Sequence, residues 1–143
     1  MPLLDKRIHR ENWFSSDEQF NQLYPSPTRL LAQRHWTPLN VARKVADFLA
    51  ADNDVRILDI GSGVGKFCLA AAHYKPGASY YGIEQRKKLV TQAETAREEL
   101  RLENVAFMNG NFTQVDFRNY QHFYFYNSFY ENIAGTDKID DSI

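Results

Sequence analysis

The sequence predicts an α/β fold in which a partial parallel sheet of about four strands carries flanking helices and follows an N-terminal helical extension. Two observations lead to this prediction. Short apolar runs alternate along the chain with segments of helical periodicity, which is the pattern of a parallel sheet with right-handed crossover connections. A glycine-containing turn at residues 61–65 joins the first apolar run to the helix that follows it.

The composition is that of one globular domain. The chain has 143 residues, of which 43% are hydrophobic and 14% aromatic, enough to build a core. Its net charge of −1 supplies no general attraction for a membrane surface or for nucleic acid, which stays possible but unsupported by charge. No apolar run is long enough for a signal peptide or a membrane span, so we expect a soluble, cytoplasmic protein.

Metal and disulfide chemistry are not expected. Cys68 is the single cysteine, which excludes an intrachain disulfide and a cysteine zinc site. The four histidines are scattered without the spacing of metal ligands.

The first 36 residues are polar with scattered aromatic side chains and a Pro25-Ser26-Pro27 break. We expect an N-terminal extension of short helices and loops over residues 1–36. Thr37 then offers a side-chain cap, and Pro38 suits the first position of a helix. Apolar residues recur at helical spacing after it, which predicts a helix over 38–50 at the start of the main domain, residues 37–143.

Four runs in the main domain have the length and composition of strands. The first is nearly continuous in apolar residues, as in a strand buried on both faces, and the fourth is aromatic throughout, which predicts a central strand. A small, apolar segment and a charged segment of strong helix formers lie between them and predict two helices. The predicted strands are 55–60, 79–83, 105–108 and 123–126, and the predicted helices are 67–74 and 86–101.

Gly61, Gly63 and Gly65 occupy alternate positions directly after the first strand. Glycine accepts a positive φ and lets a ligand approach the backbone closely, although an ordinary tight turn uses glycine as well. Glu84 closes the second strand, where its carboxylate would lie beside the glycine turn and could accept hydrogen bonds from ribose hydroxyls. The alternative for Glu84 is an acid at a helix start. Together, the turn and the acid predict an adenosine cofactor in a Rossmann-like fold.

Other nucleotide cofactors are weaker candidates. The dinucleotide fingerprint requires glycine at the position that Lys66 occupies, and no Gly-Lys-Ser/Thr phosphate loop occurs in the chain. NAD, FAD and ATP are therefore disfavoured.

Three segments resemble the cofactor motifs of class I S-adenosylmethionine-dependent methyltransferases. Residues 57–65, Ile-Leu-Asp-Ile-Gly-Ser-Gly-Val-Gly, are similar to the first motif of that family, and residues 81–84, Tyr-Gly-Ile-Glu, to the second. The exit of the third strand, residues 108–112, resembles the Gly-Asp step of the family, with Asn111 in place of the aspartate. The resemblance covers roughly residues 37–130 and concerns the cofactor rather than the substrate.

The resemblance implies S-adenosylmethionine as the cofactor. Asp59 and the backbone of Gly61 and Gly63 would hold its methionine end, and Glu84 its ribose. Asn111 would face the adenine amino group with Phe112 against the base, unless Asn111 is a plain turn residue. The full predicted cofactor-binding set is Thr37, Asp59, Gly61, Ser62, Gly63, Gly65, Glu84, Asn111 and Phe112.

Two weaker resemblances concern the methyl acceptor. Residues 35–38, His-Trp-Thr-Pro, are similar to an element of amino-group DNA methyltransferases, but residues 127–130 lack the two prolines that follow the fourth strand in those enzymes. The glycine turn and residues 82–84 also resemble the non-SET nucleosomal lysine methyltransferases. The acceptor therefore stays open between a protein lysine, nucleic acid and a small molecule.

Methyl transfer requires alignment of the acceptor with the methyl group and exclusion of water. We expect the acceptor at the exit of the fourth strand, where ligands of such folds bind, and we predict that Asn127 and Tyr130 orient or deprotonate it. The alternative function is a module that binds the cofactor or a partner without turnover, and an NAD-dependent oxidoreductase is a weaker possibility.

The resemblance implies further strands after the fourth, yet only residues 131–143 follow Tyr130. We therefore expect a C-terminally incomplete domain. The free side of the fourth strand should be covered by another copy in a homo-oligomer or by residues 1–36, because an unpaired edge is a template for another chain.

Overall fold

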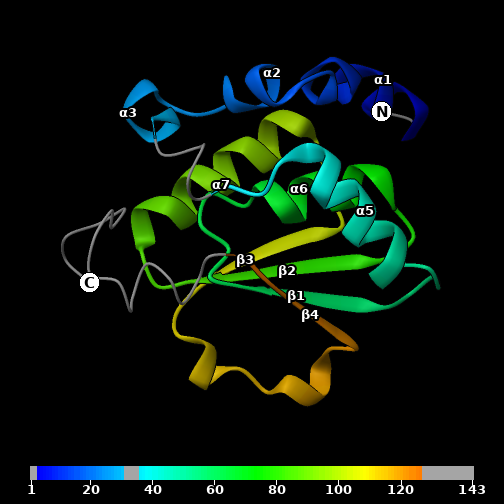
Figure 1. Ribbon diagram of the computed structural model, residues 1–143, viewed down its shortest axis with the longest axis vertical. Helices are drawn as coiled ribbons and strands as arrows, with labels where there is room; N and C mark the ends of the chain where they lie inside the picture. Colours follow the sequence, from blue (N-terminus) through cyan, green and yellow to red (C-terminus); the bar gives the residue numbers. More distant parts are fainter. Residues whose placement is uncertain (1–2, 31–35, 127–143) are drawn as a thin grey trace.

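The computed structural model describes residues 3–30 and 36–126 and confirms the predicted α/β fold. Its sheet has four parallel strands in the order β3-β2-β1-β4 (Figure 1). Each strand lies within one residue of a run predicted from the sequence. The strands are β1 (Arg56–Ile60), β2 (Ser79–Glu84), β3 (Val105–Asn109) and β4 (His122–Phe125).

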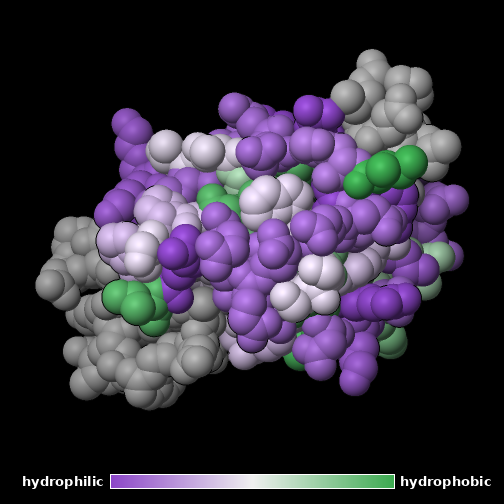
Figure 2. All heavy atoms as spheres, turned by 90° about the horizontal axis from the view of Figure 1, so that it is seen from above, coloured by the Kyte–Doolittle hydropathy of each residue, from purple (hydrophilic) through white to green (hydrophobic). Residues whose placement is uncertain are grey.

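The helices form two layers above one face of the sheet (Figure 1). The inner layer is α5 (Leu39–Leu49), α6 (Lys66–Tyr74) and α7 (Lys87–Leu100). The outer layer belongs to the N-terminal extension and consists of α1 (Leu3–Glu11), η1 (Asn12–Phe14), α2 (Asp17–Asn21) and α3 (Ser26–Arg29). Seen from above, this outer layer is mostly hydrophilic, as expected of an exposed surface (Figure 2).

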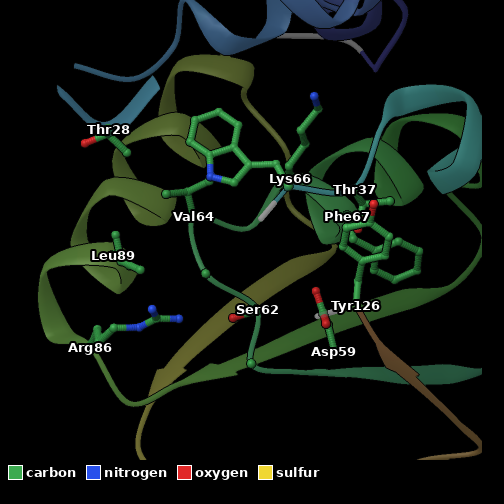
Figure 3. A pocket seen from close by; sticks show the side chains of 13 residues that line it. Thr28, Thr37, Asp59, Ser62, Val64, Lys66, Phe67, Arg86, Leu89 and Tyr126 are labelled. Carbon is green, nitrogen blue, oxygen red and sulfur yellow. The ribbon is translucent and has the colours of Figure 1, made fainter. Parts of the chain in front are cut away.

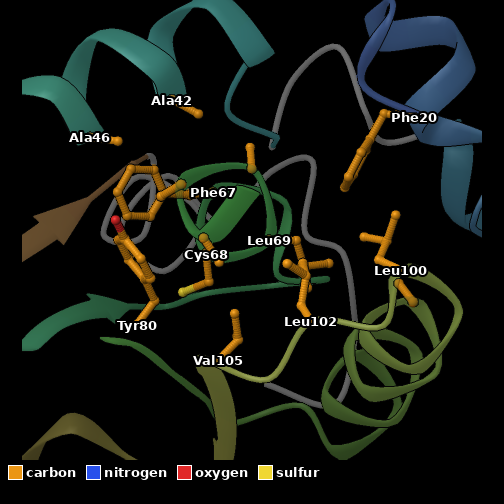
Figure 4. Packing of buried hydrophobic residues seen from close by; sticks show 14 of the residues in the cluster. Phe20, Ala42, Ala46, Phe67, Cys68, Leu69, Tyr80, Leu100, Leu102 and Val105 are labelled. Atoms are coloured by element: carbon orange, nitrogen blue, oxygen red, sulfur yellow. The ribbon is translucent and has the colours of Figure 1, made fainter. Parts of the chain in front are cut away.

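The main core lies between the sheet and the inner helices. Three consecutive alanines of α6, Ala70 to Ala72, are fully buried, and their small side chains let the helix approach the sheet closely. Figure 4 shows Phe20 of α2 pointing toward Leu69 and Leu100, so the outer layer contributes to the same core. Full burial of such a side chain stabilises the fold by about 1.5–3 kcal/mol relative to exposure.

A smaller core lies on the opposite face of the sheet. Leu58, Ile60 and Ile83 are buried there beneath the segment from residue 110 to 121. This segment contains two 3₁₀ turns, η2 (Phe112–Gln114) and η3 (Phe117–Asn119). Burial on both faces explains why Ile57, Leu58 and Ile60 of β1 are apolar.

β4 is an edge strand of the described sheet, so the prediction that it is central is wrong. Among the described strands it pairs with β1, and Phe123 and Phe125 are 37% and 48% exposed. Its aromatic residues serve different faces: Tyr124 stacks on Phe67 with ring centroids 4.0 Å apart, while Phe123 points to the smaller core's side. The described N-terminal helices lie over α5–α7 and leave this edge uncovered (Figure 1). The prediction that residues 1–36 cover the fourth strand is therefore wrong for the described part of that segment. Pairing with another copy stays a prediction.

The N-terminal layer is attached to α6 through His73. The imidazole stacks on Phe14 with centroids 4.1 Å apart, and Arg10 donates a hydrogen bond from Nε to His73 Nδ1 over 3.2 Å. Burial, together with the nearby charges of Arg7 and Arg10, lowers the pKa of His73 to about 4. The ring is therefore neutral at physiological pH and able to accept this bond.

α5 begins at Leu39, and its N-terminus is capped differently from the prediction. Pro38 is the N-cap residue, and the Leu39 N–H donates to Oδ1 of Asp17 in α2 over 2.9 Å. The predicted cap, Thr37, instead shares a 3.1 Å hydrogen bond with the hydroxyl of Tyr124. A carboxylate from a distant helix thus replaces the local cap that the sequence suggested.

A membrane-spanning helix, which needs a long apolar stretch, does not occur in the described ranges.

Candidate functional site

The glycine turn between β1 and α6 depends on three positive φ angles. Gly61, Gly63 and Gly65 have φ values of 74°, 58° and 84°, a region that residues with a Cβ rarely adopt. The N–H groups of Gly61 and Ser62 both donate to the carbonyl of Ile83, over 2.9 and 3.1 Å. The turn is thereby tied to the end of β2.

The second and third glycines differ in their surroundings. A Cβ on Gly63 would meet no atom within 4 Å, so this glycine faces open space. A Cβ on Gly65 would lie 2.5 Å from Phe107 and 3.1 Å from Ala93, so this glycine allows the turn to pack on β3 and α7. Gly63 is therefore the position where a ligand can approach the backbone, and Gly65 is required for packing.

A pocket lies in front of this turn, at the carboxyl end of β1 and β4 (Figure 3). It brings together five of the residues predicted to bind the cofactor: Thr37, Asp59, Gly61, Ser62 and Gly63. The other lining residues come from the N-terminal region, the turn, two helices and the end of β4, and they are Thr28, Trp36, Val64, Lys66, Phe67, Arg86, Leu89 and Tyr126.

Glu84 does not itself line this pocket, but its carboxylate holds Gly63 and Arg86, which do. Its carboxylate accepts a hydrogen bond from the Gly63 N–H over 3.0 Å and another from the Arg86 N–H over 2.9 Å. The Arg86 guanidinium also binds it with two nitrogens, over 2.7 and 3.0 Å, and both side chains are buried. The acid that the sequence singles out is therefore next to the glycine turn, but its partner Arg86 was not foreseen.

Asp59 is the second acid of the pocket and is 4% exposed. Burial and, to a smaller extent, the charge of Glu84 raise the pKa of Asp59 well above its usual value. No described residue donates a hydrogen bond to this carboxylate. Asp59 pairs in register with Tyr124 of β4, and Figure 3 shows it beside Tyr126. A cation entering the pocket would complement it.

Two predicted cofactor residues on η2 and at its N-cap lie away from the pocket. Asn111 accepts a hydrogen bond from the Thr113 N–H and caps η2, and Phe112 packs in the smaller core, so neither lines the pocket. Their roles at the adenine stay predictions. Asn127 and Tyr130 lie outside the described residues.

The sequence does not predict the contributions of Thr28, Trp36, Lys66 and Arg86 to the pocket. In the sequence, Lys66 differs only in departing from the dinucleotide fingerprint. Its buried ammonium donates to Oδ1 of Asp17 over 2.7 Å and to Oδ1 of Asn21 over 3.1 Å. The spacing of Glu84 and Arg86 in the sequence was a usable signal for an ion pair, whereas nothing local pointed to Thr28 or Trp36.

These residues fit a cofactor with an adenosine and a cationic end. Ser62 Oγ is the buried side-chain polar atom that has no hydrogen-bond partner in the described part of the chain, and Gly63 faces open space. Asp59 supplies a carboxylate without a hydrogen-bond donor, which a cation would satisfy. Among the residues that the structure describes, no three His, Cys, Asp or Glu side chains cluster as metal ligands would.

Comparison with known proteins agrees with this geometry. A family model described as a methyltransferase domain matches residues 51–129, more than half of the chain. A tRNA (guanine-N(7)-)-methyltransferase of Microcystis aeruginosa is 48% identical over 54 residues, which is 38% of this chain and 26% of that protein. The enzyme of the same name from Nostoc sp. is 32% identical over 81 residues, 57% of this chain and 36% of that protein. The chain thus spans about a quarter to a third of these relatives.

Solved structures show the same fold. An RNA methyltransferase from Salinibacter ruber, in complex with S-adenosyl-L-homocysteine, superposes with a TM-score of 0.56 at 25% identity, over 69% of this chain and 66% of that one. A precorrin-6y C5,15-methyltransferase from Geobacter metallireducens gives a TM-score of 0.57 at 16% identity, over 73% of this chain and 57% of that one. The second similarity concerns the fold alone.

Proposed function

The chain belongs to the family of class I methyltransferase domains, which depend on S-adenosylmethionine, and on this basis we propose that it methylates a guanine of RNA at N7. The observation that carries the proposal is that the curated relatives compared with it are tRNA (guanine-N(7)-)-methyltransferases. The matched segments cover only part of each relative, so the acceptor requires a direct test.

The chemistry of guanine N7 suits a pocket of this kind. N7 is a hydrogen-bond acceptor with a free lone pair, so its methylation requires no base to remove a proton. The cofactor supplies an electrophilic methyl group on a sulfonium. The protein then has to align N7 with that methyl group and exclude water. Since the net charge of −1 gives no general attraction for RNA, recognition would depend on local contacts.

The pocket residues would hold the cofactor as follows. Glu84 would accept hydrogen bonds from ribose hydroxyls, after exchange with part of its contact to Arg86. Asp59 would lie at the cationic methionine end, and the open side of Gly63 would receive the ligand against the backbone. The assignments of Asp59 and Gly63 follow from their positions in the pocket lining, and that of Glu84 from its contacts with Gly63 and Arg86.

The test uses the chain with S-adenosylmethionine labelled in its methyl group and an unmodified tRNA transcript. We expect label in the RNA, and mass spectrometry of the nucleosides should identify 7-methylguanosine. A matched transcript made with 7-deazaguanosine, in which C–H replaces N7, should accept no label. Equal labelling of both transcripts, or labelling of added protein only, would exclude guanine N7 as the acceptor. Cofactor binding without any transfer would instead favour the binding module.

The Asp59→Asn variant should separate stability from cofactor affinity. Because the folded-state pKa of Asp59 is raised, this carboxyl group lowers the stability of the ligand-free fold as the pH rises from the unfolded pKa of about 4 toward the folded-state pKa, and this cost is absent below about pH 4. We expect Asp59→Asn to raise the free energy of unfolding by about 1 kcal/mol at pH 7 and to leave it unchanged near pH 3. Urea unfolding at both pH values measures this difference.

The same variant should bind S-adenosylmethionine about tenfold more weakly at pH 7, because the carboxylate faces a cation there. Binding of a cation favours the ionised acid, so the affinity of the unchanged chain should fall as the pH is lowered through the raised pKa of Asp59. S-adenosylhomocysteine has a neutral sulfur in place of the sulfonium. Its affinity should therefore depend less on Asp59 and on pH. Equal losses for both ligands, with no pH dependence, would contradict the placement of Asp59 at the cationic end.

A further inference from the structure

The segment from α2 to α3, residues 17–29, contacts the pocket from the side of the N-terminal layer. Thr28 lines the pocket, and Trp36 and Thr37 extend the same side beyond the segment. The segment touches three parts of the cofactor-binding unit: the glycine turn, the first residue of α6, and α7. An extension that served only to cover α6 and α7 would not need contacts to the turn itself.

The contact with the glycine turn is a buried hydrogen bond. Tyr24, which is 2% exposed, donates from its hydroxyl to the carbonyl of Val64 over 2.8 Å. Its ring also meets Trp36 edge to face, with centroids 4.9 Å apart. Because Val64 follows Gly63, this bond holds the backbone of the turn at the place where the ligand approaches.

The contact with α6 is an ion pair between the buried Lys66 and the half-exposed Asp17. Lys66 is 4% exposed, and its ammonium lies 2.7 Å from Oδ1 of Asp17 and 5.5 Å from the ring centroid of Phe20. The same Asp17 oxygen accepts the Leu39 N–H over 2.9 Å, so one carboxylate connects α2 with the starts of α5 and α6. The Lys66 ammonium also lies 6.0 Å from the ring centroid of Trp36, and Figure 3 shows the Lys66 side chain pointing away from Asp59.

The third contact joins the end of the segment to α7. The Thr28 hydroxyl donates a hydrogen bond to Oε1 of Gln92 over 3.1 Å. Leu89, one turn earlier on α7, lines the pocket together with Thr28. The segment therefore spans the pocket from the start of α6 to the middle of α7.

We propose that residues 17–29 form a wall of the cofactor site and that Tyr24 and Lys66 are positioning residues, which hold this wall against the glycine turn and slow the release of the cofactor. The inference rests on the proposed function insofar as the pocket must be the S-adenosylmethionine site. It goes beyond that function in giving the N-terminal layer a role in cofactor retention.

The test measures the dissociation rate of S-adenosylhomocysteine by stopped flow, because this rate reports on folded, liganded molecules. Tyr24→Phe removes only the hydroxyl, and Lys66→Met keeps the length and the contact with Phe20 while removing the charge. Each should accelerate dissociation about tenfold, the effect of losing one buried polar contact. Combining Lys66→Met with Asp17→Asn should add little to Lys66→Met alone, because both changes break the same ion pair.

A second lysine–aspartate pair provides the matched control. Lys75 and Asp47 join α6 and α5 over 3.6 Å, and neither residue lines the pocket. Lys75→Met should leave the dissociation rate unchanged, whatever its effect on thermal unfolding. Tight binding by the unchanged chain with the same dissociation rate in Tyr24→Phe and Lys66→Met would overturn this inference alone. Failure of the unchanged chain to bind S-adenosylhomocysteine would overturn the proposed function and this inference with it.

Discussion

Gly63→Val should abolish binding of S-adenosylmethionine and S-adenosylhomocysteine, with a loss of affinity of at least about 100-fold. Gly63 has a φ of 58°, which a β-branched residue resists, and its missing side chain leaves open space on the pocket side of the turn. Valine would place its methyl groups in the space that the ligand requires. Calorimetric titration measures the loss, and circular dichroism should show that secondary structure is retained.

Gly65→Ala provides the contrast for this experiment. A Cβ at Gly65 would lie 2.5 Å from Phe107, so the substitution should lower the free energy of unfolding by about 1–3 kcal/mol. Gly63→Ala, which meets no atom within 4 Å, should cost only the strain of its positive φ, about 1–2 kcal/mol. Wild-type affinity in a folded Gly63→Val protein would mean that the cofactor binds elsewhere.

Glu84→Ala should weaken both the fold and the site. The Glu84 carboxylate is 3% exposed and accepts hydrogen bonds from Gly63 and Arg86, so its removal leaves a buried guanidinium without its carboxylate. Loss of one partner of a buried ion pair typically costs about 3–5 kcal/mol in the free energy of unfolding. Cofactor affinity should fall further, by about 1.5–3 kcal/mol, because a charged acceptor for the ribose is lost.

Two variants separate these effects. Glu84→Gln keeps the shape and an accepting oxygen, and should recover part of the stability while still binding the cofactor more weakly. Glu94→Ala breaks a partly exposed pair with Arg97, 3.0 Å apart on α7, and should cost less than about 1 kcal/mol. Urea unfolding of the ligand-free proteins and calorimetry of the folded ones measure the two quantities. If Glu84→Ala matched the unchanged chain in both, Glu84 would have neither role.

Local patterns were sufficient for the elements that contain the cofactor motifs. The strands and Glu84 were placed correctly because β1 and β2 are short runs with buried apolar residues. The turn was placed correctly because glycine suits the positive φ angles at its three alternate positions. The resemblance to class I methyltransferases added the cofactor, which the family match bears out. It did not add the acceptor, since the resemblance concerns the cofactor rather than the substrate.

Local patterns failed where a residue's partner is distant in the chain. Thr37 looked like a helix cap, but the capping carboxylate is that of Asp17, and Thr37 contacts Tyr124 instead. The aromatic residues of β4 suggested a central strand, but β4 is at the edge of the described sheet. This prediction failed because side-chain type indicates burial of a strand's faces and not the number of strands that pair with it.

The sequence by itself therefore determined the strands, the glycine turn and the acid that follows it, since each depends on residues close together in the chain. Only the tertiary structure decided which distant residues surround that turn: Tyr24 on Val64, and Asp17 on Lys66. These two contacts join residues 40 or more positions apart. Such pairs form when packing of the apolar core brings whole helices together, and neither residue carries a local signal for its partner.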